Sequence, residues 1–283
     1  MTCVLATAVR FLVLTQWLTQ WVMPGLAEQA NSCKLDMASK AFDDQYKGCT
    51  EIMDKKAPQL LKKELEVNKK FKDEWENAQI RWKEIKSHID SSKQLNDFQG
   101  TALVAYTGEI ARDFNKAVRE FGENHDNFQF KALHYYLTRA LQLLTTNECR
   151  TVYRGITIKC PYSGSGNVRF GHLASSSMDI NVAKSYINNK KGTLFTIKTC
   201  LGVPIKAFAF KPNEDEVLIP GYEVFQRVTV KNISKTYDEV SLENPKRFTS
   251  NYNCIYSSGM KECPALSLLL PSLLVLLLLP AAL

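Results

Sequence analysis

Several features that would assign this chain to a special class of protein are absent. The sequence has no Cys-x-x-Cys pair and no Cys/His cluster, so no zinc site is indicated. It has no internal repeat, and its 13 glycines and 10 prolines follow no collagen-like pattern. Its basic residues are not clustered as in a nucleic-acid-binding protein, although the formal net charge is +7. No polar linker divides the chain, so we expect one continuous domain.

The overall composition is that of a globular protein. The chain has 283 residues, of which 45% are hydrophobic and 23% charged, and this excludes a disordered protein. Part of the apolar content is concentrated at the two ends of the chain. We interpret both ends as processing signals that do not belong to the fold.

The N-terminal segment has the pattern of a secretory signal peptide. Arg10 is followed by a mostly apolar stretch to Val22, and small residues lie before a cleavage site after Ala27. A buried N-terminal helix is the alternative, and it fits poorly because a polar stretch begins at Glu28. We expect residues 1–27 to be removed as the chain enters the secretory pathway.

The C-terminal segment 264–283 is uncharged and mostly leucine. A run of this length can span a membrane, but prolines interrupt it and no charged residue follows it. Small residues and a short polar spacer precede this tail, and the combination is the signal for attachment of a GPI anchor. We expect residues 259–283 to be a propeptide and the anchor to be attached to Ser257 or Ser258. A retained transmembrane tail is the alternative.

Removal of both ends leaves a mature chain of residues 28–258. Cys3 and Cys263 leave with the ends, and in an oxidising compartment the remaining cysteines should be mostly paired. These are Cys33, Cys49, Cys149, Cys160, Cys200 and Cys254. Spacing alone does not choose among their possible connectivities. Asn232 begins an N-glycosylation sequon at the end of a predicted strand, and is therefore a candidate glycosylation site.

The first half of the mature chain is predicted to be helical. Between Pro58 and Asp90 the apolar residues recur at steps of three and four, which is one face of an α-helix. They are Phe71, Trp75, Ala78, Trp82, Ile85 and Ile89. Two tryptophans at this spacing indicate core packing, not a ligand site. Further helices are predicted over residues 101–119 and 126–144.

From Cys149 onward, short β-rich runs alternate with turns. Strands are predicted over residues 151–158, 168–174, 193–200, 205–210, 216–219, 223–232 and 236–242, with one short helix over residues 180–187. Helices first and strands second favour an α+β fold, in which a helical N-terminal half packs on a mostly antiparallel β-sheet.

Three segments of the β half have unusual polar content. Arg154 lies inside an apolar strand, Ser175-Ser176-Ser177 ends a second one, and Glu214-Asp215-Glu216 precedes a third. Each has an ordinary explanation: a surface arginine, a turn or helix cap, and a solvated loop.

Taken together, the three segments fit one anionic ligand. Arginine is the bidentate partner of phosphate, and a hydroxyl cluster could hold a ribose. Glu214 and Glu216 share one face of an extended segment, and neighbouring carboxylates suit cleavage of a glycosidic bond through a cationic centre. These residue types alone do not identify the ligand.

The order and spacing of the three segments resemble the arginine-serine-glutamate signature of the vertebrate ecto-ADP-ribosyltransferases. The flanking sequences Arg169-Phe170-Gly171 and Glu216-Val-Leu-Ile-Pro-Gly-Tyr-Glu-Val-Phe225 support this resemblance, as do both processing signals. It covers nearly the whole chain and implies an α+β fold of the ADP-ribosyltransferase type. The implied activity is transfer of ADP-ribose from NAD to arginine side chains of extracellular or cell-surface proteins, with release of nicotinamide. The enzyme would be GPI-anchored on the extracellular face of the plasma membrane.

The resemblance also implies a role for each residue of the signature. Arg154 would bind the pyrophosphate of NAD, and the Gly155 backbone would hold the nicotinamide carboxamide. Ser175 would support the nicotinamide ribose and position Glu216, which would stabilise the oxocarbenium ion. Glu214 would orient the acceptor guanidinium and help to deprotonate it, because a free guanidinium is a poor nucleophile. No metal would be needed, nor would any of the four histidines, His88, His125, His134 and His172.

The same family pattern implies the disulfides Cys49–Cys254 and Cys149–Cys200. Cys33 and Cys160 would then pair or remain free, and a free Cys160 near the site would make the activity sensitive to thiol reagents. Two alternative functions stay open: an NAD glycohydrolase with little transferase activity, and a catalytically silent surface antigen or binding module on the same fold. In the family pattern a glutamate at this position goes with arginine as the acceptor, so the resemblance, with Glu214 present, favours arginine transfer.

Overall fold

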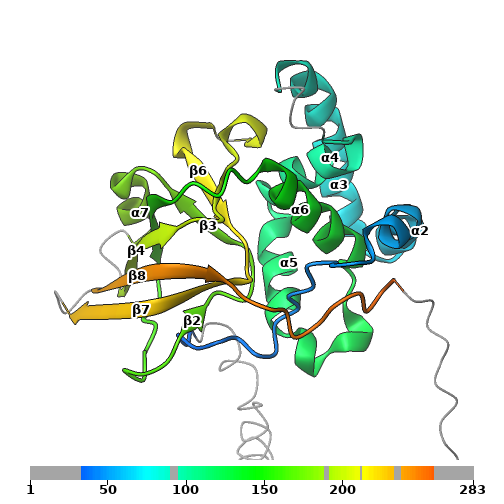
Figure 1. Ribbon diagram of the computed structural model, residues 1–283. Coiled ribbons are helices and arrows are strands. Elements are labelled where there is room, and N and C mark those ends of the chain that lie inside the picture. Colours follow the sequence, from blue (N-terminus) through cyan, green and yellow to red (C-terminus); the bar gives the residue numbers. More distant parts are fainter. Residues whose placement is uncertain (1–32, 90–94, 188–190, 211, 233–236, 258–283) are drawn as a thin grey trace, which may run out of the picture.

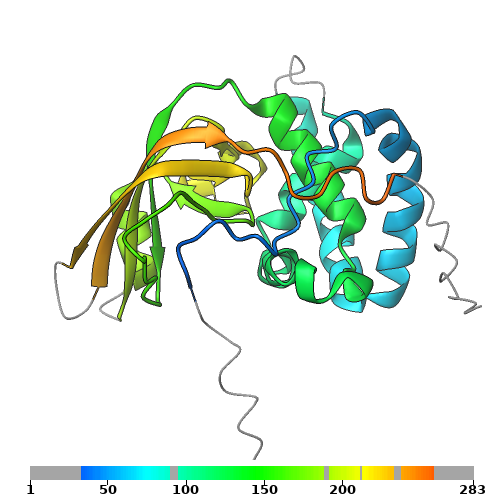
Figure 2. The same ribbon diagram turned by 60° about the horizontal axis from the view of Figure 1, so that its bottom comes forward.

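The computed structural model describes residues 33–89, 95–187, 191–210, 212–232 and 237–257 (Figure 1). The expected signal peptide, Ser258 and the C-terminal tail lie outside the described residues, as does most of the Asn232 sequon. The chain has an α+β fold, and Figure 2 shows the helices of its first half on one side of the molecule and the sheet on the other. Within the part of the chain that is described, no helix is both long enough and apolar enough to cross a bilayer.

The helical half contains α2 (Thr50–Val67), α3 (Lys69–Ile85), α4 (Asp97–Tyr106), α5 (Ile110–Arg119) and α6 (Lys131–Leu144), with short 3-10 turns between them. The apolar face predicted for α3 is buried in the main core. Trp75 and Trp82 are 2% and 4% exposed, so the prediction that they pack in the core is confirmed.

Two helix predictions have wrong boundaries. In one case a side chain close to a turn ends the helix, and in the other a side chain distant in sequence decides where the helix begins. The single helix predicted over residues 101–119 is interrupted at residues 107–109, where the Thr107 hydroxyl donates to the Val104 carbonyl and Gly108 follows. The helix predicted from residue 126 begins at Lys131. The buried Glu64 carboxylate accepts the backbone N–H groups of Lys131 and Ala132, at 2.5 Å and 3.1 Å, and so caps α6.

The second half forms an eight-stranded sheet in the order β2-β7-β8-β4-β1-β3-β6-β5. Its strands are β1 (Arg150–Ile156), β2 (Val168–Arg169), β3 (Ala174–Ser177), β4 (Gly192–Thr199), β5 (Val203–Pro204), β6 (Glu216–Ile219), β7 (Glu223–Asn232) and β8 (Tyr237–Arg247). The pairing of the described strands is antiparallel except between β4 and β8. The predicted fold class, helices packed on a mostly antiparallel sheet, is therefore confirmed.

Two strand predictions are wrong. The strand predicted over residues 168–174 ends at Arg169, because Gly171 has a φ of +73° and lies against Ala38 and Ala41, where a Cβ would collide. The strand predicted over residues 205–210 is instead a 3-10 turn, η6 (Lys206–Phe208). This turn directs Phe208 into the helical core, where its ring stacks on Trp82.

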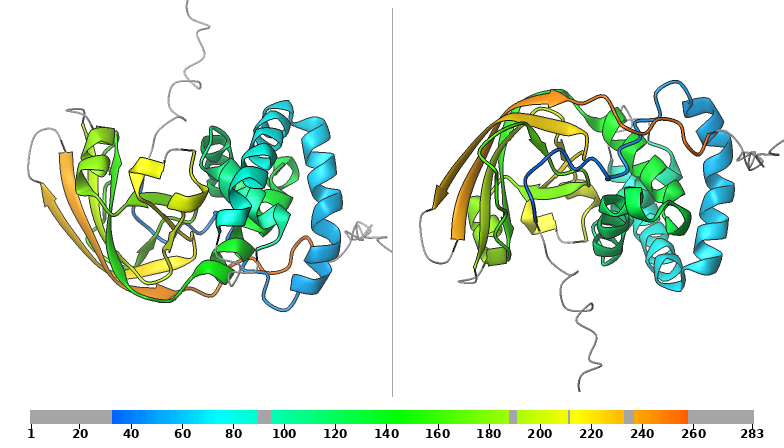
Figure 3. Two further views of the ribbon diagram at one scale, coloured as in Figure 1. Left: turned by 90° about the horizontal axis from the view of Figure 1, so that it is seen from above. Right: turned by 90° about the horizontal axis from the view of Figure 1, so that it is seen from below.

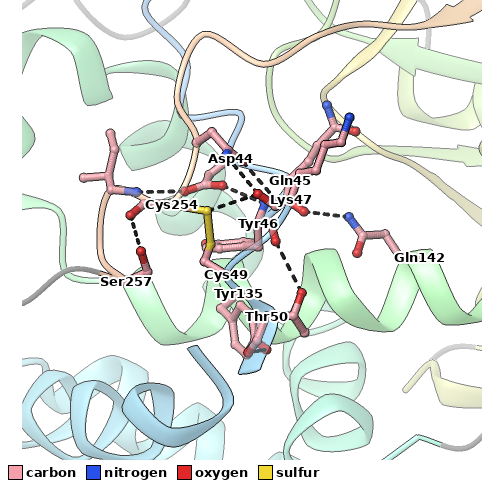
Figure 4. Close-up of a disulfide and its surroundings, with 12 residues drawn as sticks. Asp44, Gln45, Tyr46, Lys47, Cys49, Thr50, Tyr135, Gln142, Cys254 and Ser257 are labelled. Atoms are coloured by element: carbon pink, nitrogen blue, oxygen red, sulfur yellow. Dashed lines mark hydrogen bonds between the residues drawn. A yellow bond between two sulfur atoms is a disulfide. The ribbon is translucent and has the colours of Figure 1, made fainter. Parts of the chain in front are cut away.

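Within the described residues, three disulfides connect distant parts of the chain: Cys33–Cys160, Cys49–Cys254 and Cys149–Cys200. The two pairs that the family pattern implies are both present. Cys160 is bonded to Cys33, so the hypothesis of a free Cys160 is wrong. Cys49–Cys254 joins the start of α2 to the C-terminal segment (Figure 4).

The two terminal segments, residues 33–49 and 248–257, run from the sheet to the helices (Figure 3). Asp43 links them, because its carboxylate accepts the backbone N–H groups of Asn251 and Tyr252, each at 3.0 Å. Arg169 of β2 forms a salt bridge of 2.7 Å with the same carboxylate, and both side chains are fully buried. Sheet, N-terminal segment and C-terminal segment are thus joined through one ion pair.

Candidate active site

Arg154 connects β1 to the neighbouring strand β3. The two strands pair through Tyr153 and Ser177, and Nη1 of Arg154 donates a hydrogen bond of 2.5 Å to the Ser175 carbonyl. Burial lowers the pKa of Arg154, and the charge of Glu216 partly compensates. A guanidinium remains a cation under these conditions, so a half-buried positive charge lies where β1 meets β3.

Glu216 is the first residue of β6 and lies beside Ser175. The antiparallel register pairs Ser177 with Glu216 and Ser175 with Leu218, which puts Ser175 and Glu216 on one face of the strand pair. The Ser175 side chain is hydrogen-bonded to the Glu216 carboxylate. Burial raises the pKa of Glu216, whereas the Ser175 hydrogen bond and the Arg154 charge lower it. The structure therefore brings Arg154, Ser175 and Glu216 together, as the sequence pattern predicts.

Glu214 also lies near Glu216, but the backbone that carries it is not the extended segment that the sequence analysis predicts. It ends a 3-10 turn, η7 (Pro212–Glu214), and the next residue, Asp215, has a φ of +42°. The prediction that Glu214 and Glu216 share a face of an extended segment is therefore wrong, because a left-handed turn separates them. The charge of Glu214 still contributes to the raised pKa of Glu216, and the Asp215 side chain pairs with Lys206 instead.

Gly155 allows helix α7 (Ile180–Ile187) to lie directly on β1. A Cβ at this position would collide with the Ala183 carbonyl oxygen, so the backbones approach too closely for any other residue. From the last turn of α7, the Tyr186 phenol donates a hydrogen bond of 3.0 Å to Oε2 of Glu214. Helix α7 thus contacts both the arginine strand and the glutamate turn.

The sequence analysis missed Tyr106 and Asn115. The buried Tyr106 phenol donates to the Leu173 carbonyl at 2.9 Å, accepts from the Asn115 amide at 2.8 Å, and is hydrogen-bonded to Ser175. Burial raises its pKa to about 12, so it stays a neutral phenol. Tyr106 ends an apolar helical run that reads as core, so no local pattern signals this contact.

His172 lies near the same arginine and is neutral. Burial lowers its pKa well below the usual value, and the charges of Arg119 and Arg154 lower it further. Nδ1 lies 2.8 Å from the Phe170 carbonyl, which can only accept, so Nδ1 carries the hydrogen. The half-buried imidazole is thus held by a local hydrogen bond to the Phe170 carbonyl.

A hollow of about 560 Å³ on the described surface includes none of these site residues. It is lined by Glu74, Asn77, Ile80, Arg81, Glu84, Thr107, Gly108, Glu109 and Phe210. The candidate site is defined by hydrogen bonds and charges between strands instead. Among the described residues, no group of three or more His, Cys, Asp or Glu side chains is arranged to hold a metal ion.

Known proteins resemble this chain over most of its length. Residues 35–250 match the model of the family described as NAD:arginine ADP-ribosyltransferase. T-cell ecto-ADP-ribosyltransferase 2 of Rattus norvegicus is 53% identical over 266 residues, which cover 93% of this chain and 95% of the relative. GPI-linked NAD(P)(+)--arginine ADP-ribosyltransferase 1 of Mus musculus is 38% identical over 245 residues, 80% of this chain and 74% of the relative. A crystal structure of a variant of the eukaryotic mono-ADP-ribosyltransferase ART2.2 in complex with NAD has a TM-score of 0.74 and 54% identity, covering 79% of this chain and 99% of that chain.

Proposed function

This chain belongs to the NAD:arginine ADP-ribosyltransferase family, and we propose that it transfers ADP-ribose from NAD to arginine side chains of extracellular proteins. The observation that carries the proposal is the hydrogen-bonded group of Arg154, Ser175 and Glu216, with Glu214 beside it. This group combines a cation for a phosphate, a hydroxyl for a ribose and a carboxylate for a developing positive charge.

The side chains present fit NAD as the donor substrate. The Arg154 guanidinium has N–H groups beyond the one bonded to Ser175, and their planar arrangement matches phosphate oxygens. We assign the pyrophosphate to Arg154, the nicotinamide carboxamide to the Gly155 backbone, and the ribose to Ser175. NAD supplies the glycosidic bond that is broken, and nicotinamide is the leaving group.

Glu216 and Glu214 divide the remaining chemistry. The ionised Glu216 carboxylate opposes the positive charge that develops on the ribose as the carbon–nitrogen bond breaks. Its raised pKa follows from the burial that also strengthens this electrostatic effect. Glu214 orients the acceptor guanidinium and takes its proton while the new carbon–nitrogen bond forms.

Hydrolysis of NAD is the second activity that the same site can perform. Water replaces the acceptor in this reaction, which requires Glu216 but does not require the guanidinium to be oriented. The presence of glutamate at position 214 favours transfer over hydrolysis. A catalytically silent surface protein is the third candidate, and the complete Arg154, Ser175 and Glu216 group argues against it.

We further propose that the mature enzyme comprises residues 28–258 and is attached to the outer face of the plasma membrane by a GPI anchor. The names of the relatives, "ecto" and "GPI-linked", support this location. Ser257, one of the two candidate attachment residues, lies close to the Cys49–Cys254 disulfide, and its hydroxyl donates to the Cys254 carbonyl at 2.7 Å. The disulfide would therefore hold the anchored end against the helical half.

Display of the full chain on transfected cells tests these proposals together. The cells receive labelled NAD with or without agmatine, a soluble guanidine, and untransfected cells are the control. We expect ADP-ribosyl-agmatine in the medium. Free ADP-ribose alone would indicate a glycohydrolase, and neither product would indicate a silent protein. Release of the activity by a phosphatidylinositol-specific phospholipase is the expected result for a GPI anchor.

A further inference from the structure

Tyr186 makes a contact that neither the signature nor the predicted roles include. It lies in the last turn of α7, the residue is 53% exposed, and its phenol oxygen is 3.0 Å from Oε2 of Glu214. The contact joins residues 28 positions apart in sequence. It therefore depends on how α7 and the glutamate turn are placed relative to each other.

The phenol is the donor in this hydrogen bond. Partial burial raises the pKa of Tyr186 to about 12, and the hydrogen bond and negative charge of Glu214 add to the effect. The side chain consequently stays protonated at physiological pH. A carboxylate can only accept, so the proton of the phenol points to Glu214.

Glu214 lies outside the regular strand that begins at Glu216. It is half-buried at the end of η7, next to a residue with a positive φ. Its backbone is held by the Ser177 hydroxyl, which donates to the Glu214 carbonyl at 2.7 Å. Ordering of the Glu214 side chain costs conformational entropy. The hydrogen bond from Tyr186 offsets this cost before the acceptor binds.

Tyr186 is itself carried by a well-fixed element. Its neighbours Ala183 and Ile187 are 2% and 3% exposed, and the α7 backbone lies against Gly155 of β1. Through α7, the hydrogen bond therefore fixes the position of the Glu214 carboxylate relative to β1, the strand that carries Arg154. Because Tyr186 engages Oε2, we assign Oε1 to the N–H of the acceptor.

We propose that Tyr186 is a positioning residue for arginine transfer, which holds the Glu214 carboxylate in the orientation that receives the acceptor guanidinium. The inference rests on the proposed function and deepens it. It names a residue that acts on the choice between guanidine and water as acceptor. It predicts a change in the ratio of transfer to hydrolysis, whereas a purely structural role would lower both activities alike.

Tyr186→Phe tests the proposal, because it keeps the ring and removes only the hydroxyl. The full chain is displayed on cells, surface abundance is measured with an antibody to an N-terminal tag placed after the signal peptide, and both products are quantified with labelled NAD and agmatine. We expect the ratio of ADP-ribosyl-agmatine to ADP-ribose to fall about tenfold, the usual size of a lost hydrogen bond to a charged group. The matched control is Tyr162→Phe, which also removes one phenol hydrogen bond, to the Gly166 carbonyl at 2.8 Å. Its ratio should stay within about twofold of the wild type.

A double-mutant cycle shows whether Tyr186 acts through Glu214. In a Glu214→Ala background, where position 214 offers the phenol no side-chain acceptor, Tyr186→Phe should change the ratio by less than about twofold. An unchanged ratio in the single variant would overturn this inference alone, as would an equal loss of both activities or a full tenfold effect in the Glu214→Ala background. Absence of ADP-ribosyl-agmatine from wild-type cells would instead overturn the proposed function, and this inference with it.

Discussion

Glu214 and Glu216 are two residues apart in sequence but lie in different surroundings. Glu216 begins a strand, contacts Ser175 and Arg154, and has a pKa raised by burial. Glu214 ends a short turn and is held through the hydroxyls of Ser177 and Tyr186. The sheet fixes the first carboxylate, whereas Tyr186 of α7 holds the second, and Ser177 of the sheet holds only the backbone of Glu214. We infer that the bond-breaking chemistry is built into the sheet, while the choice of acceptor depends on the turn that carries Glu214.

Glu216→Gln should impair the bond-breaking step that transfer and hydrolysis share. We expect both transfer and hydrolysis to fall at least about 1000-fold, because the amide carries no charge to oppose the cation on the ribose. Both products are measured on displayed protein, and NAD binding is measured in parallel to establish that the site is intact. Full transferase activity in this variant would contradict the mechanism.

Glu214→Gln should separate the two activities. Transfer to agmatine is expected to fall about 100-fold while hydrolysis changes several-fold at most, since water does not need the oriented carboxylate. Asp215→Asn is the matched control, because Asp215 lies between the two glutamates but pairs with Lys206. Equal losses of transfer and hydrolysis in Glu214→Gln would show that the two carboxylates do not have separate roles.

The parts of this arrangement that lie in regular elements were predictable from sequence. The apolar face of α3, the strand that contains Arg154, and the positions of Ser175 and Glu216 follow from periodicity and from the resemblance of the ordered segments. In each case the signal is local, or is a fixed order of short segments. The same periodicity also indicates which face of each element is buried in the core.

What sequence could not predict depends on contacts between elements. Between Glu214 and Glu216 the chain turns at Asp215, which has a positive φ. The sequence pattern does not indicate such a backbone angle. The Tyr186–Glu214 contact and the Cys33–Cys160 pair exist only because the fold brings distant segments together. The start of α6 is likewise decided by Glu64, a residue of another helix.

Ser175→Ala sharpens the comparison because, of the two carboxylates, it removes a hydrogen bond to Glu216 and none to Glu214. Burial raises the pKa of Glu216 and the Ser175 hydrogen bond lowers it, so loss of the hydroxyl should raise this pKa further. Because the carboxylate must be ionised to act, the acidic side of the pH profile of both activities should move to higher pH. We expect the loss of activity to be larger at acidic pH than near pH 8. In the matched control Ser176→Ala, the lost hydroxyl donates to the Val217 carbonyl at 2.7 Å, so the profile should keep its position.

The smallest effect on activity is expected from loss of the Cys33–Cys160 disulfide. The double variant Cys33→Ser, Cys160→Ser opens a loop of 127 residues but removes no contact to Glu214 or Glu216. The N-terminal segment keeps its other attachments, because Arg169 donates to the Met37 carbonyl and pairs with Asp43. Transfer and hydrolysis should therefore stay within about twofold of the wild type, while the midpoint of thermal unfolding falls by several degrees because the unfolded chain gains freedom.

Thiol alkylation without reduction should also leave wild-type activity unchanged, since all the cysteines in the described residues are disulfide-bonded. A marked loss of activity in the double variant, or on alkylation of the wild type, would mean that the N-terminal segment takes part in the site, and that stability and catalysis are not separable here.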